Sequence, residues 1–378
     1  MKKINNILCY IICTIMFFAL TACNNVEQEK KELNEITDFV LDVEKGRDVK
    51  ILQLSDIQII DSSQMRTPTR LNAGSITNWA PERMEEVAFK FVRQVVERVQ
   101  PDLIVLSGDN MYGEFDDNGT VLQALISFID SFKIPWTLCY GNHDNESIKG
   151  VVWQSEQYIN AEYCMFKRNN DIVDGNGNFT VGITQGGELV QVVYLMDSHG
   201  CVASDSEEGV FTTPGIYENQ IEWFDNISKN LVEYNDNKPV KSIGFSHHPL
   251  RAIGDGLQKY GYTSLRHNFY DADENAIKFS SVTIPPNNDG DFGTMLKDAG
   301  QLIDSDYSFF NLLKQYGVNG WFFCHDHENA ISVMHEGVRL TYGLKSSQYD
   351  SYSRDLIGGT QITVGKYAFE VENVYYNY

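Results

Sequence analysis

Side chains able to bind metal ions recur at the ends of apolar segments in this sequence. Each of five segments that read as buried strands is followed at once by such residues. A polar pair such as Gly108-Asp109 is by itself ordinary turn chemistry. Ligands of α/β sheets bind at the carboxyl ends of strands, however, so five matched strand ends predict one shared site. The segments are LQLSDIQ with Asp56 and Gln58, LIVLSGDNMY with Asp109 and Tyr112, WTLCYGNHD with Asn142, His143 and Asp144, SIGFSHHP with His247 and His248, and WFFCHDH with His325 and His327.

The types of these side chains indicate a centre that holds two cations. Five of the eight histidines of the chain lie in these segments. A carboxylate can bridge two cations, while imidazole, amide oxygen and phenolate complete coordination shells suited to Fe, Zn or Mn. No pair of cysteines is spaced as in a structural zinc site. Cys324 precedes His325, but the alternation of a strand end turns it away, so we interpret it as a packed residue.

The elements that must position these residues alternate along the chain. Pro81 to Gln100 shows apolar residues at helical spacing, and Pro101 marks the end of that helix. The alternation predicts a layered α/β domain over residues 48–378, with helices outside and sheet within. Strands are expected at 50–55, 102–107, 134–140, 190–196, 240–246 and 320–324, helices at 81–100, 120–132, 217–234 and 305–316, and short antiparallel runs such as GVRLTYG and TQITVG after residue 330.

The N-terminal segment predicts export and lipid anchoring. A basic start, a short apolar run and Leu20-Thr21-Ala22-Cys23 resemble a bacterial lipoprotein signal, with residues 1–22 removed and Cys23 lipidated. A single membrane helix is the alternative, but the apolar run is short for a span of about 20 residues. Residues 23–47 are polar and predict a tether that holds the domain on the extracytoplasmic side of a bacterial membrane.

Charge and cysteine content exclude several classes of protein. The formal net charge is −22, from 30 basic and 52 acidic residues, which argues against nucleic-acid polymers as partners. Four cysteines, Cys139, Cys164, Cys201 and Cys324, are too few for a disulfide scaffold in so large a domain. One bridge or four buried thiols are equally compatible with the sequence.

Taken in order, the strand-end residues resemble a known family. Asp56, Asp109, Asn142-His143-Asp144, His247 and His325-x-His327 follow the signature of calcineurin-like metallophosphoesterases over about residues 48–345. This resemblance implies an α/β/β/α sandwich, with two central mixed sheets flanked by helices. Two residues depart from the pattern, since Gln58 stands where the family commonly has histidine and Cys324 where it has glycine. GDNMY, with Tyr112, resembles the Gly-Asp-x-x-Tyr motif of purple acid phosphatases, in which tyrosine replaces that missing histidine as a ligand.

The resemblance also implies how the ligands divide between two metals. Metal one takes Asp56, Asp109 and His327, together with either Tyr112 or the Gln58 amide oxygen. Tyr112 could instead be an aromatic ring stacked beside the site. Metal two shares Asp109 and adds Asn142, His247 and His325, where His247 is chosen over His248 because of its His-x-Pro spacing with Pro249. His143 faces the substrate and is oriented by Asp144.

The predicted reaction is phosphoester hydrolysis, with monoester or diester specificity left open. Two cations acidify a water whose hydroxide attacks phosphorus, and His143 assists the leaving group. The substrate is a phosphorylated small molecule or ester, which His248 and Arg266 could contact. The long segment 251–300 is interpreted as a lid or specificity loop, or else as mobile surface. The loop 61–80, Asp197 and His199 are interpreted as further lining of the site mouth. The alternative is a surface lipoprotein that uses the same fold only for binding, because a fold does not guarantee activity.

Overall fold

The computed structural model describes residues 31–60, 84–113, 116, 118–147, 149–169, 172–200, 213–262, 281–297, 305–365 and 369–378. Almost all of them belong to a compact unit from Leu33 to Tyr378. The expected signal segment, Cys23, the loop 61–80, Cys201 and Arg266 lie outside the described residues. Within the described residues, no helix is long and apolar enough to cross a bilayer.

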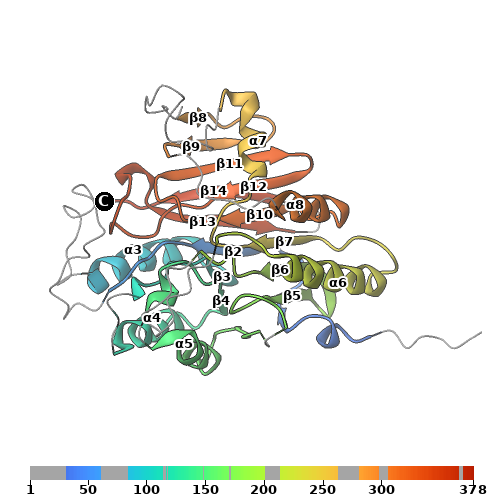
Figure 1. The fold of residues 1–378 in the computed structure, drawn as a ribbon, viewed down its shortest axis with the longest axis horizontal. Coiled ribbons are helices and arrows are strands. Elements are labelled where there is room, and N and C mark those ends of the chain that lie inside the picture. The colour runs from blue at the N-terminus through green and yellow to red at the C-terminus, as the bar shows by residue number, and fades with distance from the viewer. Residues whose placement is uncertain are drawn as a thin grey trace, which may run out of the picture. The chain divides into compact units, whose positions relative to one another are not determined.

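Two mixed sheets form the centre of the unit (Figure 1). The smaller sheet contains, in spatial order, β14 (Phe369–Tyr375), β13 (Gly358–Val364), β2 (Val49–Leu54), β3 (Leu103–Leu106) and β4 (Trp136–Leu138). The larger sheet contains β1 (Phe39–Asp42), β5 (Phe179–Gln185), β6 (Glu188–Leu195), β7 (Ser242–Phe245), β10 (Gly320–Phe323), β12 (Val338–Tyr342), β11 (Asn329–His335), β9 (Phe292–Met295) and β8 (Val282–Ile284). Strands β2, β3 and β4 are mutually parallel, and so are β6, β7, β10 and β12.

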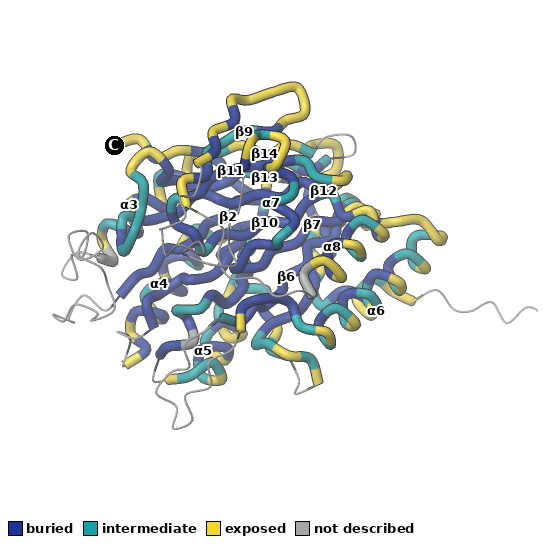
Figure 2. The backbone as a smooth tube through the Cα atoms, turned by 45° about the horizontal axis from the view of Figure 1, so that its top comes forward, coloured by how far each residue is buried: buried dark blue, intermediate teal, exposed yellow. Residues whose placement is uncertain are grey.

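The strands of the larger sheet are buried on both faces because they lie between two apolar layers. In β6, Val193 and Leu195 join the cluster shared with the smaller sheet, whereas Val192 and Tyr194 join the cluster on the opposite face. Successive side chains of a strand point to opposite faces, so a strand between two layers must be apolar at every position. The central strands are accordingly buried throughout, as Figure 2 shows.

Helices cover the outer faces of the two sheets. Apolar residues of α3 (Met84–Val99) and α4 (Thr120–Asp130) belong to the same cluster as β2 and β3 of the smaller sheet. Those of α6 (Glu218–Tyr234), α7 (Ala252–Leu257) and α8 (Ser305–Gln315) belong to the cluster on the outer face of the larger sheet. The expected α/β/β/α sandwich is therefore confirmed. The remaining helical elements are α5 (Gly150–Ile159), η1 (Leu33–Glu35), η4 (Asp144–Glu146), η5 (Gln258–Tyr260) and η6 (Arg354–Leu356).

Two expectations about segment boundaries are corrected, and three elements were missed. Strand β1 pairs in parallel with β5, so residues 33–47 belong to the folded unit and are not part of a tether. Strands β1 and β5 and helix α5 were not predicted. The segment 251–300 is not simply a loop, because its described part contains α7, η5 and the hairpin β8–β9 at the edge of the larger sheet. In short segments such as FTVGITQ, apolar and polar residues alternate too irregularly to predict a strand from sequence.

Candidate metal centre

The five predicted loops meet where the two sheets face each other. Strands β2, β3 and β4 of the smaller sheet and β7 and β10 of the larger sheet each lead directly into one of them. The loops are joined by backbone hydrogen bonds from Asp56 N–H to the Gly108 carbonyl and from Cys324 N–H to the His247 carbonyl. The structure therefore brings the predicted ligands together from two different sheets.

One group of ligand atoms comes from Asp56, Asp109 and His327. Their ligand atoms all lie within 4.8 Å of one another, and His327 Nε2 is 3.5 Å from Asp56 Oδ1. Both carboxylates are buried, and neither Asp56 Oδ1 nor Asp109 Oδ2 has a hydrogen-bond donor among the described residues. A buried carboxylate oxygen without a donor is costly unless a cation compensates it. These two oxygens therefore suit metal ligation.

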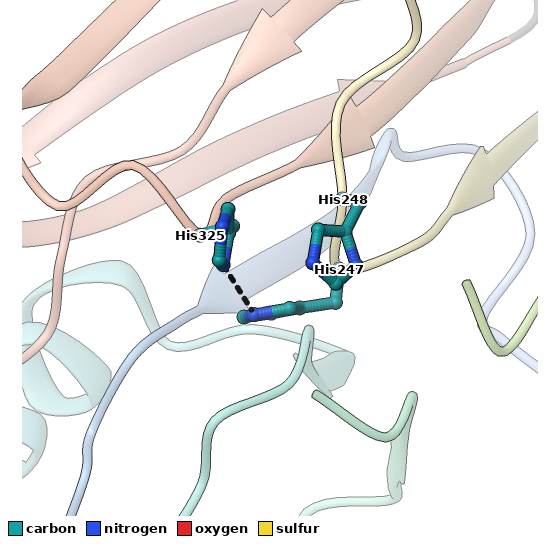
Figure 3. A group of neighbouring side chains, drawn as sticks. All are labelled: His247, His248 and His325. Carbon is teal, nitrogen blue, oxygen red and sulfur yellow. Dashed lines mark hydrogen bonds between the residues drawn. The ribbon is translucent and has the colours of Figure 1, made fainter. Parts of the chain in front are cut away.

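A second group surrounds the Nε2 atom of His247. This nitrogen lies 3.0 Å from Asn142 Oδ1, 3.3 Å from His325 Nδ1 and 3.4 Å from Asp109 Oδ2. Figure 3 shows the His247 and His325 rings turned toward each other from the ends of β7 and β10. Asp109 borders both groups, which is the position that a bridging carboxylate requires.

The ring nitrogens that point away from the centre have partners of their own. His247 Nδ1 lies 3.3 Å from the Ser107 carbonyl oxygen, and His327 Nδ1 lies 3.0 Å from that of Ser351. The carboxylate of Asp350 is 3.7 Å from the same nitrogen of His327. Metal-binding histidines ordinarily donate their second N–H to a carbonyl or carboxylate, which fixes the tautomer. Both rings thus present Nε2 to the centre.

Burial and the two carboxylates together set the ionisation of the histidines. Burial lowers the pKa of His325 and His327 well below the usual value, which keeps both rings neutral and able to bind a cation. Burial also acts to lower the pKa of His247, but the charge of Asp109 outweighs it and raises this pKa well above the usual value. Metal binding at His247 therefore competes with protonation of its ring.

The backbone at the strand ends is unusual. Asp56, Gln58, Asp109 and His325 have φ angles of 47°, 49°, 49° and 77°, a left-handed conformation that is uncommon for residues with a side chain. A Cβ atom at Gly141 would lie 2.1 Å from the Asp109 amide nitrogen, so only glycine fits there. Strained backbone of this kind concentrates at functional sites.

The structure gives the Gln58 oxygen a partner other than a metal. Lys345 Nζ donates to Gln58 Oε1 over 2.6 Å and to the Asp56 carbonyl over 2.8 Å. In this structure a lysine uses the amide oxygen, and ligation of metal one through Gln58 stays a prediction. Sequence could not reveal this contact, since 287 positions separate the two residues.

Tyr112 is stacked on His143. Their ring centroids are 4.2 Å apart with an interplanar angle of 25°, and Tyr112 is buried. The stacked arrangement is the alternative that the sequence left open for this residue. Ligation through the Tyr112 phenolate stays a prediction.

The orientation of His143 differs from the expectation. Its Nε2 lies 3.9 Å from Asp109 Oδ2, and its Nδ1 lies 2.9 Å from Glu146 Oε2. Asp144 instead accepts hydrogen bonds from the backbone N–H groups of Asn110, Met111 and Gly141. The 3₁₀ turn η4 brings the residue three positions after His143 beside its ring, so Glu146 orients it and Asp144 joins the two loops.

The other predicted residues among those described follow β6 and β7. The His248 ring centroid is 4.3 Å from that of His325, and His248 Nδ1 lies 3.2 Å from Ser198 Oγ. His199 stacks on Tyr217, and Asp197 accepts a hydrogen bond from the His199 backbone N–H.

The described cysteines behave as packed thiols. Cys324 is buried, as expected, and its Sγ touches His247 Nδ1 at 3.2 Å on the side away from Asn142. Burial raises the pKa of this thiol to about 11, which disfavours the thiolate that a metal needs. Cys139 and Cys164 also carry free thiols.

Sequence reasoning missed Glu146, Lys345 and the pair Asp350-Ser351. The spacing of three between His143 and Glu146 was the only local signal. Lys345, Asp350 and Ser351 follow β12 in a segment that was expected only to supply strands, and nothing in its sequence points to the centre.

Comparisons with known proteins identify the family of the chain. The model of the calcineurin-like phosphoesterase family matches residues 49–329. The chain is 32% identical to phosphatase DCR2 of Saccharomyces cerevisiae over 119 residues. This matched segment covers 29% of this chain and 20% of that protein. It is 25% identical over 269 residues to probable inactive purple acid phosphatase 29 of Arabidopsis thaliana, covering 67% of this chain and 61% of that protein. The chain thus spans about a fifth and about three fifths of the length of these two relatives.

A solved structure shares the fold. The dimetal phosphatase from Danio rerio superposes with a TM-score of 0.54 at 11% sequence identity, covering 88% of this chain and all of that one. This likeness concerns the fold alone. The family match extends over most of the described strands and includes every predicted metal ligand, from Asp56 to His327. The chain is therefore a member of the calcineurin-like phosphoesterase family.

Proposed function

We propose that the protein hydrolyses phosphate esters with a centre of two metal ions. The observation that carries this proposal is the convergence of six metal-ligating side chains, Asp56, Asp109, Asn142, His247, His325 and His327. Two of their buried carboxylate oxygens, Asp56 Oδ1 and Asp109 Oδ2, accept no hydrogen bond from the described residues. A merely structural cluster would have satisfied those oxygens with hydrogen bonds.

The residues fit two cations that share one carboxylate. Site one is formed by Asp56, Asp109 and His327, and site two by Asp109, Asn142, His247 and His325. Nitrogen and oxygen donors in this mixture suit Fe, Zn or Mn. Bound cations would supply Lewis-acid chemistry, which draws electron density from the phosphoryl group and acidifies water.

The protein's own residues then handle the departing group. His143 faces the centre with its Nε2 and can protonate or hydrogen-bond the leaving oxygen. Glu146 holds the opposite ring nitrogen, and Tyr112 stacks on the ring face, so the imidazole is fixed in one orientation. His248, beside His325, is positioned to contact the phosphoryl group of a phosphorylated small molecule or ester.

Turnover and metal content of the purified full-length chain test the proposal. The chain is loaded with Mn, Zn or Fe and offered nitrophenyl phosphate and bis-nitrophenyl phosphate, which separates monoesterase from diesterase activity. We expect two metals per chain and hydrolysis of at least one substrate. His325→Ala should abolish hydrolysis and weaken metal binding at site two, whereas His335→Ala should change neither turnover nor metal content, since His335 stacks on Phe310 outside the centre.

A binding protein without turnover is the second candidate. The name of the Arabidopsis relative includes the word inactive, and the departure at Gln58 removes a ligand common in the family. Two bound metals without hydrolysis of either ester, after loading with all three metals, would favour this candidate over the enzyme.

We also propose that Cys23 anchors the protein by lipid to the extracytoplasmic side of a bacterial membrane. The support is the sequence Leu20-Thr21-Ala22-Cys23 after a short apolar run. Mass spectrometry of the N-terminal peptide should show a lipidated cysteine. Cys23→Ala should release the protein from the membrane fraction, and an unmodified Cys23 in membrane-bound protein would contradict the proposal.

A further inference from the structure

A buried lysine lies next to the ligands of site one. Lys345 follows β12, and only 1% of its surface is exposed. Its backbone bridges Ser55 at the end of β2 and Ile357 before β13. This double pairing fixes the lysine backbone beside the loop that carries Asp56 and Gln58.

The lysine side chain engages that loop at two points. Its Nζ donates to the carbonyl oxygen of Asp56 and to the amide oxygen of Gln58, at 2.8 and 2.6 Å. The opposite end of the same amide, Gln58 Nε2, is buried and has no acceptor among the described residues. The orientation of the Gln58 side chain is therefore set by Lys345, since reversing the amide would place two donors against each other.

The lysine also brings its charge near the centre. Asp56, Asp109 and Asp350 are the carboxylates that attract this ammonium group. A cation bound by Asp56 and Asp109 would compete with Lys345 for the same negative charge, and two like charges in a buried site repel each other strongly. Site two is formed by different histidines, and its residues have no hydrogen bond to Lys345 among those of the described residues.

We propose that Lys345 keeps Gln58 out of the metal centre and weakens site one, so that site one binds its cation less tightly than site two. Site one is then formed by the side chains of Asp56, Asp109 and His327 without Gln58. The inference rests on the proposed function only in requiring that the centre binds cations, and hydrolysis is not needed for it.

Calorimetric titration of the full-length, metal-stripped chain with Mn²⁺ tests the inference. Wild-type protein should show two binding events of different affinity. His327→Ala should remove the weaker event and His325→Ala should weaken the tighter one. If His327→Ala removes the tighter event instead, the assigned order of the two sites is wrong and the inference fails.

The decisive variant is Gln58→Leu combined with Lys345→Met. Replacing both partners of the buried Lys345–Gln58 hydrogen bond with apolar groups of similar size limits the cost to folding, and only the Asp56 carbonyl loses its donor. Removing the lysine charge should tighten Mn²⁺ binding at site one by roughly tenfold or more. If Gln58 were a ligand, binding would weaken by a similar factor, and if Lys345 were only a structural tie, binding would not change. Either result overturns the inference.

Two further variants keep the test interpretable. Lys345→Gln alone retains a donor for Gln58 while removing the charge, so it should also tighten site one if the double variant fails to fold. Lys259→Met removes a different lysine ion pair, the one between the partly exposed Lys259 and the buried Asp291, and should leave both Mn²⁺ affinities unchanged. A chain that binds two cations as expected but hydrolyses no ester would refute the proposed function and leave this inference intact.

Discussion

Buried carboxylates in two regions of this protein differ in how many hydrogen bonds they accept. At the metal centre, Asp56 and Asp109 each have one oxygen with no donor among the described residues. In the hairpin β8–β9, Asp291 is equally buried, but each of its oxygens has two donors. Its Oδ2 accepts from Lys259 and Tyr260, and its Oδ1 accepts from the Met334 backbone N–H and from Arg339.

The difference separates a binding site from a structural ion pair. Asp291 is fully satisfied by the protein, so it joins the hairpin to β11, β12 and η5 and needs no ligand. The oxygens at the centre lie close to one another and to metal-binding histidines, an arrangement that a bound cation stabilises. Burial of a carboxylate alone would not have distinguished the two sites.

The largest expected effect comes from Asp109→Asn. Asp109 borders both groups of ligands, so the variant should lose both metals. The metals are expected to stabilise the transition state by several kcal/mol, so their loss corresponds to a fall in turnover of about 10³-fold or more. Elemental analysis and ester hydrolysis measure the two quantities, and Asp291→Asn is the matched control that should keep both metals.

His143→Ala should lower turnover by about 10²–10⁴-fold, the usual contribution of a general acid or base. Metal content should stay near that of the wild type, because His143 is not among the proposed ligands. Glu146→Gln should show a smaller loss in the same direction, since the ring is still present but less firmly oriented. Loss of metal in His143→Ala would instead make it a ligand.

Asp291→Ala should destabilise the fold and leave the centre intact. Removing one partner of a buried ion pair leaves the buried Arg339 uncompensated, which costs about 3–5 kcal/mol. Urea unfolding measures the loss, and metal titration serves as the control. A change in metal stoichiometry without a change in stability would reverse the roles of the two groups.

Metal loading should stabilise the wild type and not Asp109→Asn. A ligand that binds only the folded state adds about 2.7 kcal/mol at a concentration of 100 times its dissociation constant. Thermal unfolding with metal and with chelator gives the difference. Equal shifts in both proteins would mean that metal binds elsewhere.

The smallest expected effect is the dependence of folding stability on pH that Asp291 causes. Burial raises the pKa of Asp291, but its bonds to Lys259 and the Met334 N–H outweigh this and hold the pKa below its ordinary value. The stability it contributes is therefore complete above the unfolded pKa of about 3.9 and is lost as the pH falls through the lower folded pKa. The stability difference between metal-free wild type and Asp291→Asn, measured by urea unfolding, should accordingly shrink below about pH 4. A difference that stays constant down to pH 3 would show that the Asp291 charge does not matter.

Much of the fold could be predicted from patterns of local sequence. All six expected strands before residue 330 and the helices α3, α4, α6 and α8 are present within a few residues of their expected bounds. The C-terminal runs GVRLTYG and TQITVG form β12 and β13, and each has an antiparallel neighbour, although β12 also pairs in parallel with β10. Strand β1 was missed because its four residues lie among charged ones, and its pairing with β5 joins segments 142 positions apart.

The sequence by itself determined which side chains would meet and in what order, because parallel strands place their following residues at the same edge of a sheet. It also indicated two cations, through the types of the donor atoms. Only the tertiary structure decided which atom faces which: Glu146 beside His143, Tyr112 stacked on it, and Lys345 on Gln58. These contacts depend on φ angles at the strand ends and on how two sheets pack together, and neither quantity is encoded in the spacing of residues along the chain.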